Sequence, residues 1–163
     1  MKLVNAVLKA NRVFICGNGG SAANAIHMAN DFISVGVKAH ALTGDVSTLT
    51  AIANDYSYEE VFSRQLFVLA EEGDLLIVLS GSGNSKNVAQ ALAAADKIGM
   101  DTFAITGSFN DPNVCTQMAK GNLRMGRDMQ EAEEAQVHLG HTVMRKIRDH
   151  GVDTYELLSG QKP

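Results

Sequence analysis

The sequence predicts an α/β fold built around a mostly parallel β-sheet. Two observations predict it: short β-type apolar runs alternate with helical stretches along the chain, and three of these runs stop at Gly or Ser. No linker or low-complexity tract interrupts the alternation, and 163 residues with 45% apolar content are enough for one hydrophobic core. We therefore expect a single domain over residues 1–163.

The elements are assigned in order from apolar spacing and from turn and cap residues. Strands are expected at Val13–Cys16, Ala39–Leu42, Leu75–Leu79, Thr102–Thr106 and Asn122–Met125. Helices are expected at Ser21–Ile33, Val46–Ala53, Tyr58–Glu71, Ser85–Ile98 and Met129–Arg148. A helical apolar spacing also marks the first residues, at Leu3, Val4, Val7 and Leu8. The stretch Phe109–Lys120 is expected to be a loop with a short helix.

Cap residues and charge order support the later helices. Ser85 is expected to be an N-cap, and Gly99 is expected to end the helix that Ser85 begins. The last helix carries acidic residues near its start and Arg145, Lys146 and Arg148 near its end. This order complements the helix macrodipole, so we interpret these charges as stabilising and solvating.

Composition excludes several classes of partner. The net charge of -4 creates no basic field for nucleic acid, and no apolar run approaches the roughly 20 residues of a bilayer span. Cys16 and Cys115 form neither a disulfide framework nor a metal pair, which suits a reducing compartment. The N-terminus does not resemble a signal peptide, and we expect a cytoplasmic protein that binds neither nucleic acid nor membrane.

The first candidate site is a glycine-rich loop, Gly17-Asn18-Gly19-Gly20-Ser21-Ala22, between a strand and a helix. Glycines at such a place let backbone N–H groups approach an anion at the helix N-terminus. The loop satisfies G-x-G-x-x-A loosely, but no acidic residue ends the next strand, where a dinucleotide fingerprint needs one. We therefore expect no nucleotide cofactor.

The second candidate site is a serine-rich loop, Ser80-Gly81-Ser82-Gly83-Asn84-Ser85, again between a strand and a helix. Three hydroxyls, backbone amides and a helix N-terminus together suit a phosphate monoester. Open α/β sheets bind ligands at the carboxyl ends of their strands, where both loops are expected. We expect a small phosphorylated molecule as the ligand.

Histidines and a carboxylate supply candidate chemistry. His27 and Asp31 are four residues apart on one helix face, and they could ligate a metal, transfer a proton or pair at the surface. In the last helix, Gln130 and His138 lie about 80° apart around the axis, so one ligand could lie between them. His40, His141 and His150 are interpreted as structural or surface residues.

Four segments in this order resemble a sugar isomerase (SIS) domain of the phosphoheptose isomerase type. They are CGNGGSAANAIHMANDF, LTAIANDYSYEEVFSRQL, GDLLIVLSGSGNSKNVAQAL and MQEAEEAQVH, and the resemblance covers about residues 13–147. It implies a three-layer doubly wound sandwich with a mostly parallel five-stranded sheet. It also implies a homotetramer with active sites at subunit interfaces, and conversion of sedoheptulose 7-phosphate to D-glycero-D-manno-heptose 7-phosphate.

The resemblance also implies the site residues. The predicted substrate-binding residues are Asn18, Gly19, Gly20, Ser21, Asp31, Asn54, Asp55, Ser80, Gly81, Ser82, Ser85 and Gln130. The predicted ligands of a divalent metal, zinc by resemblance, are His27, Asp31, Gln130 and His138. Three positions depart from the family: Gly81 replaces Thr, Asp31 replaces Glu, and Glu133 replaces a His.

The mechanistic hypothesis is proton transfer through an enediol. Asp31 is the predicted base at carbon and His138 the predicted acid and base at oxygen, although the spacing leaves open which of them takes the carbon proton. Two alternatives stay open: a non-catalytic SIS regulator that binds a sugar phosphate or a protein such as a replication initiator, and an isomerase of a hexose or aminosugar phosphate.

Overall fold

The computed structural model describes residues 2–151 and confirms the predicted α/β class. All five strands are parallel, in the order β2-β1-β3-β4-β5. They span β1 Val13–Gly17, β2 Ala39–Ala41, β3 Leu75–Ser80, β4 Asp101–Thr106 and β5 Gly121–Arg124. Strands β1 and β3 are buried along their whole length, because helices cover both faces of the sheet.

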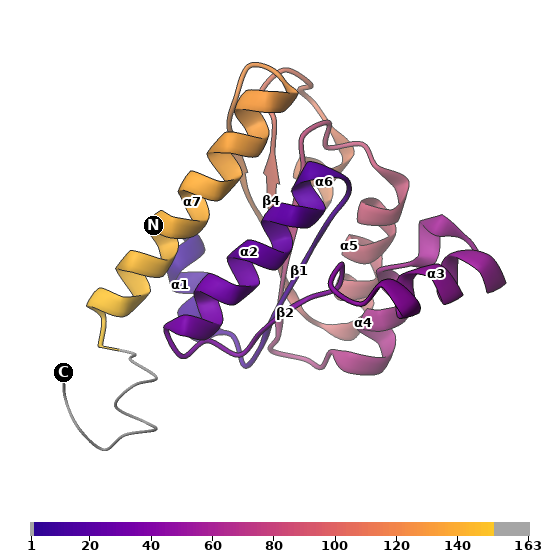
Figure 1. Ribbon diagram of the computed structural model, residues 1–163, viewed down its shortest axis with the longest axis horizontal. Coiled ribbons are helices and arrows are strands. Elements are labelled where there is room, and N and C mark those ends of the chain that lie inside the picture. The colour runs from indigo at the N-terminus through magenta and orange to yellow at the C-terminus, as the bar shows by residue number, and fades with distance from the viewer. Residues whose placement is uncertain (1, 152–163) are drawn as a thin grey trace.

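Helices surround the sheet as two outer layers (Figure 1). They span α1 Lys2–Lys9, α2 Gly20–Ser34, α3 Val46–Asp55, the 3-10 helix η1 Tyr58–Glu60, α4 Ser63–Leu69, α5 Lys86–Ile98, α6 Val114–Met118 and α7 Met129–Asp149. One hydrophobic core lies between the sheet and α1, α2 and α7, and a second lies between the sheet and α4, α5 and α6. The three-layer sandwich is therefore confirmed for the described residues.

One predicted helix is corrected. The stretch expected to be a single helix, Tyr58–Glu71, consists of η1 and α4, separated by a turn at Val61 and Phe62. Both turn residues are almost fully buried, at 0% and 1% exposure, so burial of two adjacent apolar side chains takes precedence over helix continuity. The predicted single domain, residues 1–163, extends past the described residues at both ends.

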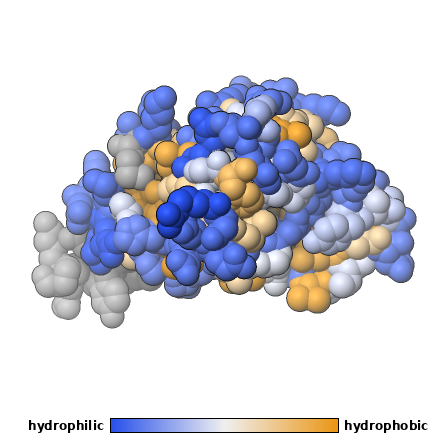
Figure 2. All heavy atoms as spheres, turned by 90° about the horizontal axis from the view of Figure 1, so that it is seen from above, coloured by the Kyte–Doolittle hydropathy of each residue, from blue (hydrophilic) through white to orange (hydrophobic). Residues whose placement is uncertain are grey.

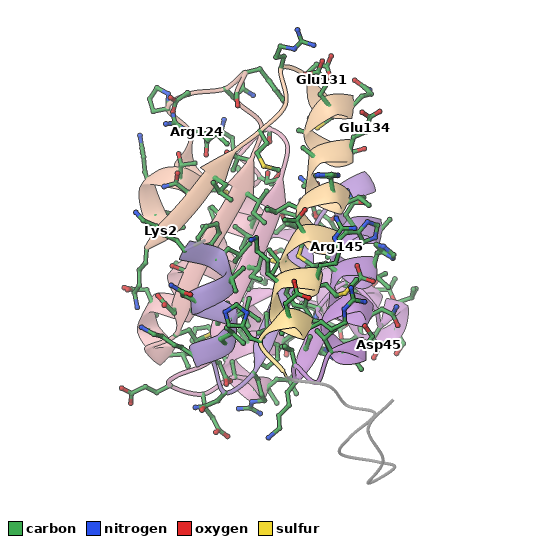
Figure 3. The ribbon with its side chains drawn as sticks, turned by 90° about the vertical axis from the view of Figure 1, so that its left-hand side faces the viewer. Lys2, Asp45, Arg124, Glu131, Glu134 and Arg145 are labelled. Atoms are coloured by element: carbon green, nitrogen blue, oxygen red, sulfur yellow. The ribbon has the colours of Figure 1, made fainter. Side chains whose placement is uncertain are left out.

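Helix α7 shows the charge order expected from the sequence. Figure 3 shows Glu131 and Glu134 on its first turns and Arg145 further along the same helix. Its first turn is capped by Asp128, whose carboxylate accepts a hydrogen bond from the N–H of Glu131.

Within the described residues, no helix combines the length and apolarity needed to cross a membrane.

Candidate functional site

Both predicted loops lie at the carboxyl ends of neighbouring strands. Loop 1 (residues 17–22) follows β1, and loop 2 (residues 80–85) follows β3, which pairs directly with β1. The chain leaves β1 toward β2 on one side and later enters β3 on the other, so the two loops flank the switch point of the sheet. Figure 2 looks onto the molecule from this end and shows a largely hydrophilic surface with apolar patches.

The helices that follow these loops begin without a side-chain cap. Gly19, the N-cap position of α2, has a φ of 56°, a conformation that favours glycine, and it supplies no side chain to the first turn. Ser85 is the N-cap residue of α5, as predicted, but its hydroxyl makes no cap hydrogen bond. The N-cap residues of both helices therefore give no side-chain acceptor to the first-turn N–H groups, and in α5 the N–H of Val88 finds one in Oδ1 of Asn87 (3.0 Å).

Loop 2 is shaped by its own hydroxyls and by α7. The hydroxyl of Ser80 accepts a hydrogen bond from the N–H of Gly83 (3.1 Å), and that of Ser82 accepts one from Asn84 (3.3 Å). A β-carbon at Gly81 would collide with the sulfur of Met129, the first residue of α7. The Thr of the resembling family therefore does not fit here while Met129 keeps this position.

The strongest candidate for chemistry is a cluster of His27, Asp31 and His141. The two imidazoles meet at their Nε2 atoms, 2.8 Å apart. Oδ2 of Asp31 lies 3.6 Å from Nε2 of His27 and 3.5 Å from Nε2 of His141. Asp31 is buried at 9% exposure, and within the described residues its Oδ2 accepts no hydrogen bond. The three side chains form a group that could hold a metal ion.

Helix α7 reaches this cluster because it packs along α2. Gly140 of α7 faces the side chain of Met28. A β-carbon added to Gly140 would lie 3.3 Å from the methyl group of Met28. Nearer the start of α2, Asn24 donates hydrogen bonds to Oε1 of Gln136 (3.0 Å) and to the carbonyl of Glu133 (2.9 Å). These contacts turn the face of α7 that carries His141 toward α2.

His138 and Gln130 do not join the cluster within the described chain. His138 is exposed and lines a separate hollow with Met125, Arg127 and Thr142. Gln130 is exposed on the first turn of α7. Within one copy of the described chain, these two residues thus lie apart from His27 and Asp31, and His141, interpreted from the sequence as a surface or packing residue, lies beside them. The predicted roles of His138 and Gln130 stay predictions.

The remaining predicted site residues are divided between the two loops and α3. Ser21 is buried in the first turn of α2. Asn54 and Asp55 are exposed at the end of α3, and the Asn54 amide donates to the Asp55 carboxylate (2.8 Å). Their contact with a substrate stays a prediction, as do the contacts predicted for both loops.

Three further residues near loop 1 were not found from the sequence. The carboxylate of Glu133 lies against Gly20, where it would meet any added β-carbon. Asn87 and Tyr58 both form hydrogen bonds with the side chain of Asn18. The spacing of Glu133, Gln136 and Gly140 at three and four residues is the one signal that could have indicated a shared α7 face.

The other reactive-looking side chains lie outside this region. His40 is exposed and stacks edge-on with Phe14, at a ring-centroid distance of 6.1 Å. Burial raises the pKa of the Cys115 thiol to about 11 and raises the pKa of the Cys16 thiol further. Both cysteines therefore remain protonated and pack as small apolar side chains.

Comparison with known proteins shows which sequences this chain resembles. The sequence signature of the SIS domain matches residues 1–107. A phosphoheptose isomerase of Thiobacillus denitrificans is 48% identical over 111 residues, which cover 64% of this chain and 56% of that protein. A phosphoheptose isomerase of Coxiella burnetii is 46% identical over 111 residues, with the same two coverages. The matched region thus spans little more than half the length of these relatives.

Solved structures extend the similarity to most of the fold. A phosphoheptose isomerase from Neisseria gonorrhoeae superimposes with a TM-score of 0.81 at 36% identity, covering 90% of this chain and 81% of that chain. One from Francisella tularensis superimposes with a TM-score of 0.85 at 28% identity, covering 91% and 83%. The matched signature, the parallel five-stranded sheet and these superpositions together show that this chain belongs to the SIS domain family.

Proposed function

We propose that this chain is a sugar-phosphate aldose–ketose isomerase that converts sedoheptulose 7-phosphate to D-glycero-D-manno-heptose 7-phosphate. The observation that carries the proposal is the buried carboxylate of Asp31 between the imidazoles of His27 and His141, on the helix that begins at loop 1. The similarity to proteins named phosphoheptose isomerase supports this choice of reaction and substrate.

We propose His27, Asp31 and His141 as ligands of a divalent metal ion, with zinc as the best fit. Two imidazole nitrogens and one carboxylate match the donors of catalytic zinc sites, which keep a fourth position open. Oδ2 of Asp31 is buried without a hydrogen-bond partner in the described chain, and a bound cation would compensate it. When bound, such an ion polarises the substrate carbonyl as a Lewis acid.

The proton transfers are assigned to Asp31 and His141. Isomerisation moves one proton between adjacent carbons and another between their oxygens, through an enediol. The carboxylate of Asp31 accepts the carbon-bound proton and returns it to the neighbouring carbon. When no ion is bound, the imidazole of His141, 3.5 Å from this carboxylate, exchanges a proton with the substrate oxygens in the role that the sequence assigned to His138. When Nε2 of His141 binds an ion, the ion would stabilise the charge on these oxygens in its place.

Loops 1 and 2 bind the phosphorylated end of the substrate in this proposal. Both loops precede helices with uncapped N-termini, and such termini favour anions through their N–H groups and the helix dipole. The hydroxyls of Ser80, Ser82 and Ser85 add donors on loop 2. Binding at this unreactive end fixes the position of the reacting carbons.

We also propose that the chain assembles as a homotetramer with active sites at subunit interfaces. Helix α3 contains no buried residue, and the last turn of α4 exposes Phe67, Val68 and Leu69. Asn54 and Asp55, which are predicted to contact the substrate, lie at the end of that exposed helix. Sedimentation of the purified chain measures this assembly.

The deciding experiment is a mass-spectrometric assay of the purified protein with sedoheptulose 7-phosphate, with and without added zinc. D31N should reduce kcat by at least about 100-fold, because a positioned acid or base contributes roughly 10²–10⁴ in rate. H141A should cause a similar loss, and H138A is its matched control three residues away. Loss of activity in H138A with retention in H141A would reverse the assignment of the imidazole.

Three outcomes would change the proposal. Robust turnover by D31N would remove Asp31 from the mechanism. Absence of conversion across a panel of phosphosugars, together with clear thermal stabilisation by one of them, would support a non-catalytic sugar-phosphate-binding regulator. Conversion of a hexose or aminosugar phosphate alone would keep the reaction class and change the substrate.

A further inference from the structure

We propose that Asn87 and Tyr58 are positioning residues that hold the side chain of Asn18, so that loop 1 offers its ligand hydrogen-bond donors and no acceptor from the Asn18 side chain. This inference deepens the proposed function and rests on it for the identity of the ligand. We call the hydrogen-bonded group of Asn18, Asn87 and Tyr58 the Asn18 clasp.

The clasp joins three segments that are distant in sequence. Nδ2 of Asn18 donates to Oδ1 of Asn87 (2.8 Å), and Nδ2 of Asn87 donates back to Oδ1 of Asn18 (2.8 Å). The hydroxyl of Tyr58 donates to the same Oδ1 of Asn18 (2.9 Å). Loop 1 is thereby tied both to the first turn of α5, which follows loop 2, and to η1.

The orientation of both amides follows from one backbone group. The N–H of Val88 faces Oδ1 of Asn87 (3.0 Å), and a backbone N–H can only donate. Oδ1 of Asn87 is therefore the acceptor, which leaves its Nδ2 facing Asn18. The atom of Asn18 that receives this N–H must be Oδ1, so the hydroxyl of Tyr58 must act as a donor to it.

This assignment determines what Asn18 can offer to a ligand. Its Oδ1 already accepts two hydrogen bonds, which occupy both lone pairs of the carbonyl oxygen. A sugar hydroxyl thus finds no free acceptor there. The second N–H of Asn18 Nδ2 takes no part in the clasp. Loop 1 thus presents donors: this N–H and the N-terminus of α2, which has no side-chain cap.

Burial makes the clasp strong enough to matter. Asn87 is only 3% exposed, so the loss of its amide would leave its partners desolvated without replacement by water. Leaving a buried polar group unpaired costs about 1–3 kcal/mol, which corresponds to about 5- to 100-fold in an equilibrium constant. Tyr58 is 59% exposed, so water can replace its hydroxyl and its contribution should be smaller.

The test compares three variants of the full chain. N87L removes the buried amide. Y58F removes only an exposed hydroxyl, so this variant is expected to fold even if N87L does not. T102V is the structural control. Thr102 is buried at the opposite end of the sheet, where its hydroxyl accepts a hydrogen bond from the N–H of Lys120 (2.9 Å). T102V should lower the Tm without any effect on loop 1.

Two measurements are made on each variant: amide hydrogen exchange of residues 18–22, and KM and kcat with sedoheptulose 7-phosphate. We expect faster exchange of loop 1 in N87L and, more weakly, in Y58F. KM should rise about 10-fold in N87L and about 3-fold in Y58F with kcat nearly unchanged, because the loop supplies uniform binding of the unreactive end.

The outcomes separate this inference from the proposed function. Unchanged loop 1 exchange in both N87L and Y58F would overturn the clasp, whatever the activity. Faster exchange with an unchanged KM would overturn its role in positioning. If the wild-type protein converts no phosphosugar, the proposed function fails. In that case, faster loop 1 exchange in N87L, together with a smaller increase of its Tm on addition of inorganic phosphate, would still support the clasp.

Discussion

Helices α2 and α5 differ from α3, α6 and α7 in how they begin. The last three are capped by their own sequence, through the side chains of Asp45, Asn113 and Asp128, which accept hydrogen bonds from N–H groups of the first turn. The first two have no such bond, although Ser85 occupies the cap position of α5. Helix α4 also lacks a cap, but it follows Phe62, whose backbone angles are already helical.

The difference shows that α2 and α5 lack the stabilisation that a side-chain N-cap gives to a helix. A side-chain cap stabilises a helix by about 0.5–2 kcal/mol, and among the helices described this contribution is absent at α4 and η1 and also at α2 and α5, which start at the switch point of the sheet. An anionic ligand can supply the same acceptor when it binds. The capped helices α3, α6 and α7 thus belong to the frame, and the uncapped N-termini of α2 and α5 face the proposed phosphate site.

Capping α5 artificially should have the largest effect on binding. S85D places a carboxylate at the N-cap position, where it can accept hydrogen bonds from the free amides and occupy the place of the phosphate. We expect a higher Tm without ligand and at least about 100-fold weaker affinity for phosphate esters, because like charges in a site cost several kcal/mol. Calorimetric titration measures the affinity.

S85A serves as the uncharged control for S85D. It removes the hydroxyl without adding a charge, so affinity should fall less and the Tm of the free protein should not rise. An S85D variant that binds phosphate esters as tightly as the wild-type protein would show that α5 does not face the anion.

Removing the N-cap of α7 should have an intermediate effect, which lowers the stability of the fold and leaves ligand affinity unchanged. D128A removes the acceptor for the N–H of Glu131 (2.9 Å) at the start of α7. Loss of an N-cap costs about 1 kcal/mol, which lowers the Tm of a chain of this size by about 2–4 °C. Thermal unfolding of D128A with and without sugar phosphate measures this loss. A change in the affinity for sugar phosphate would contradict the view that the cap of α7 contributes to stability alone.

The smallest expected effect concerns the exposed cap of α3. Hydrogen bonds from the hydroxyls of Thr48 and Ser47 lower the pKa of Asp45 to about 2. Because this folded pKa lies below the ordinary value of about 3.9, the stabilisation is present above pH 4 and is lost as the pH falls toward 2. The difference in Tm between wild type and D45N should shrink over this range, and a constant difference would exclude the cap as its source.

Much of the fold could be predicted from local pattern. The five strands were located to within one or two residues. The three central strands β1, β3 and β4 were found because buried parallel strands are short continuous apolar runs bounded by Gly or Ser. The break between η1 and α4 was missed, because Val61 and Phe62 are compatible with a helix and only their burial against the sheet requires the turn. Local pattern cannot report which apolar residues will be buried together.

The candidate site divides in the same way. The sequence by itself determined that glycine- and serine-rich loops follow β1 and β3 and that His27 and Asp31 share one face of α2, since both statements depend on near neighbours in the chain. Only the tertiary structure decided that His141 and not His138 meets them. The two histidines lie about 60° apart on α7 and flank its buried face, and the packing of Gly140 against Met28 determines which flank faces α2.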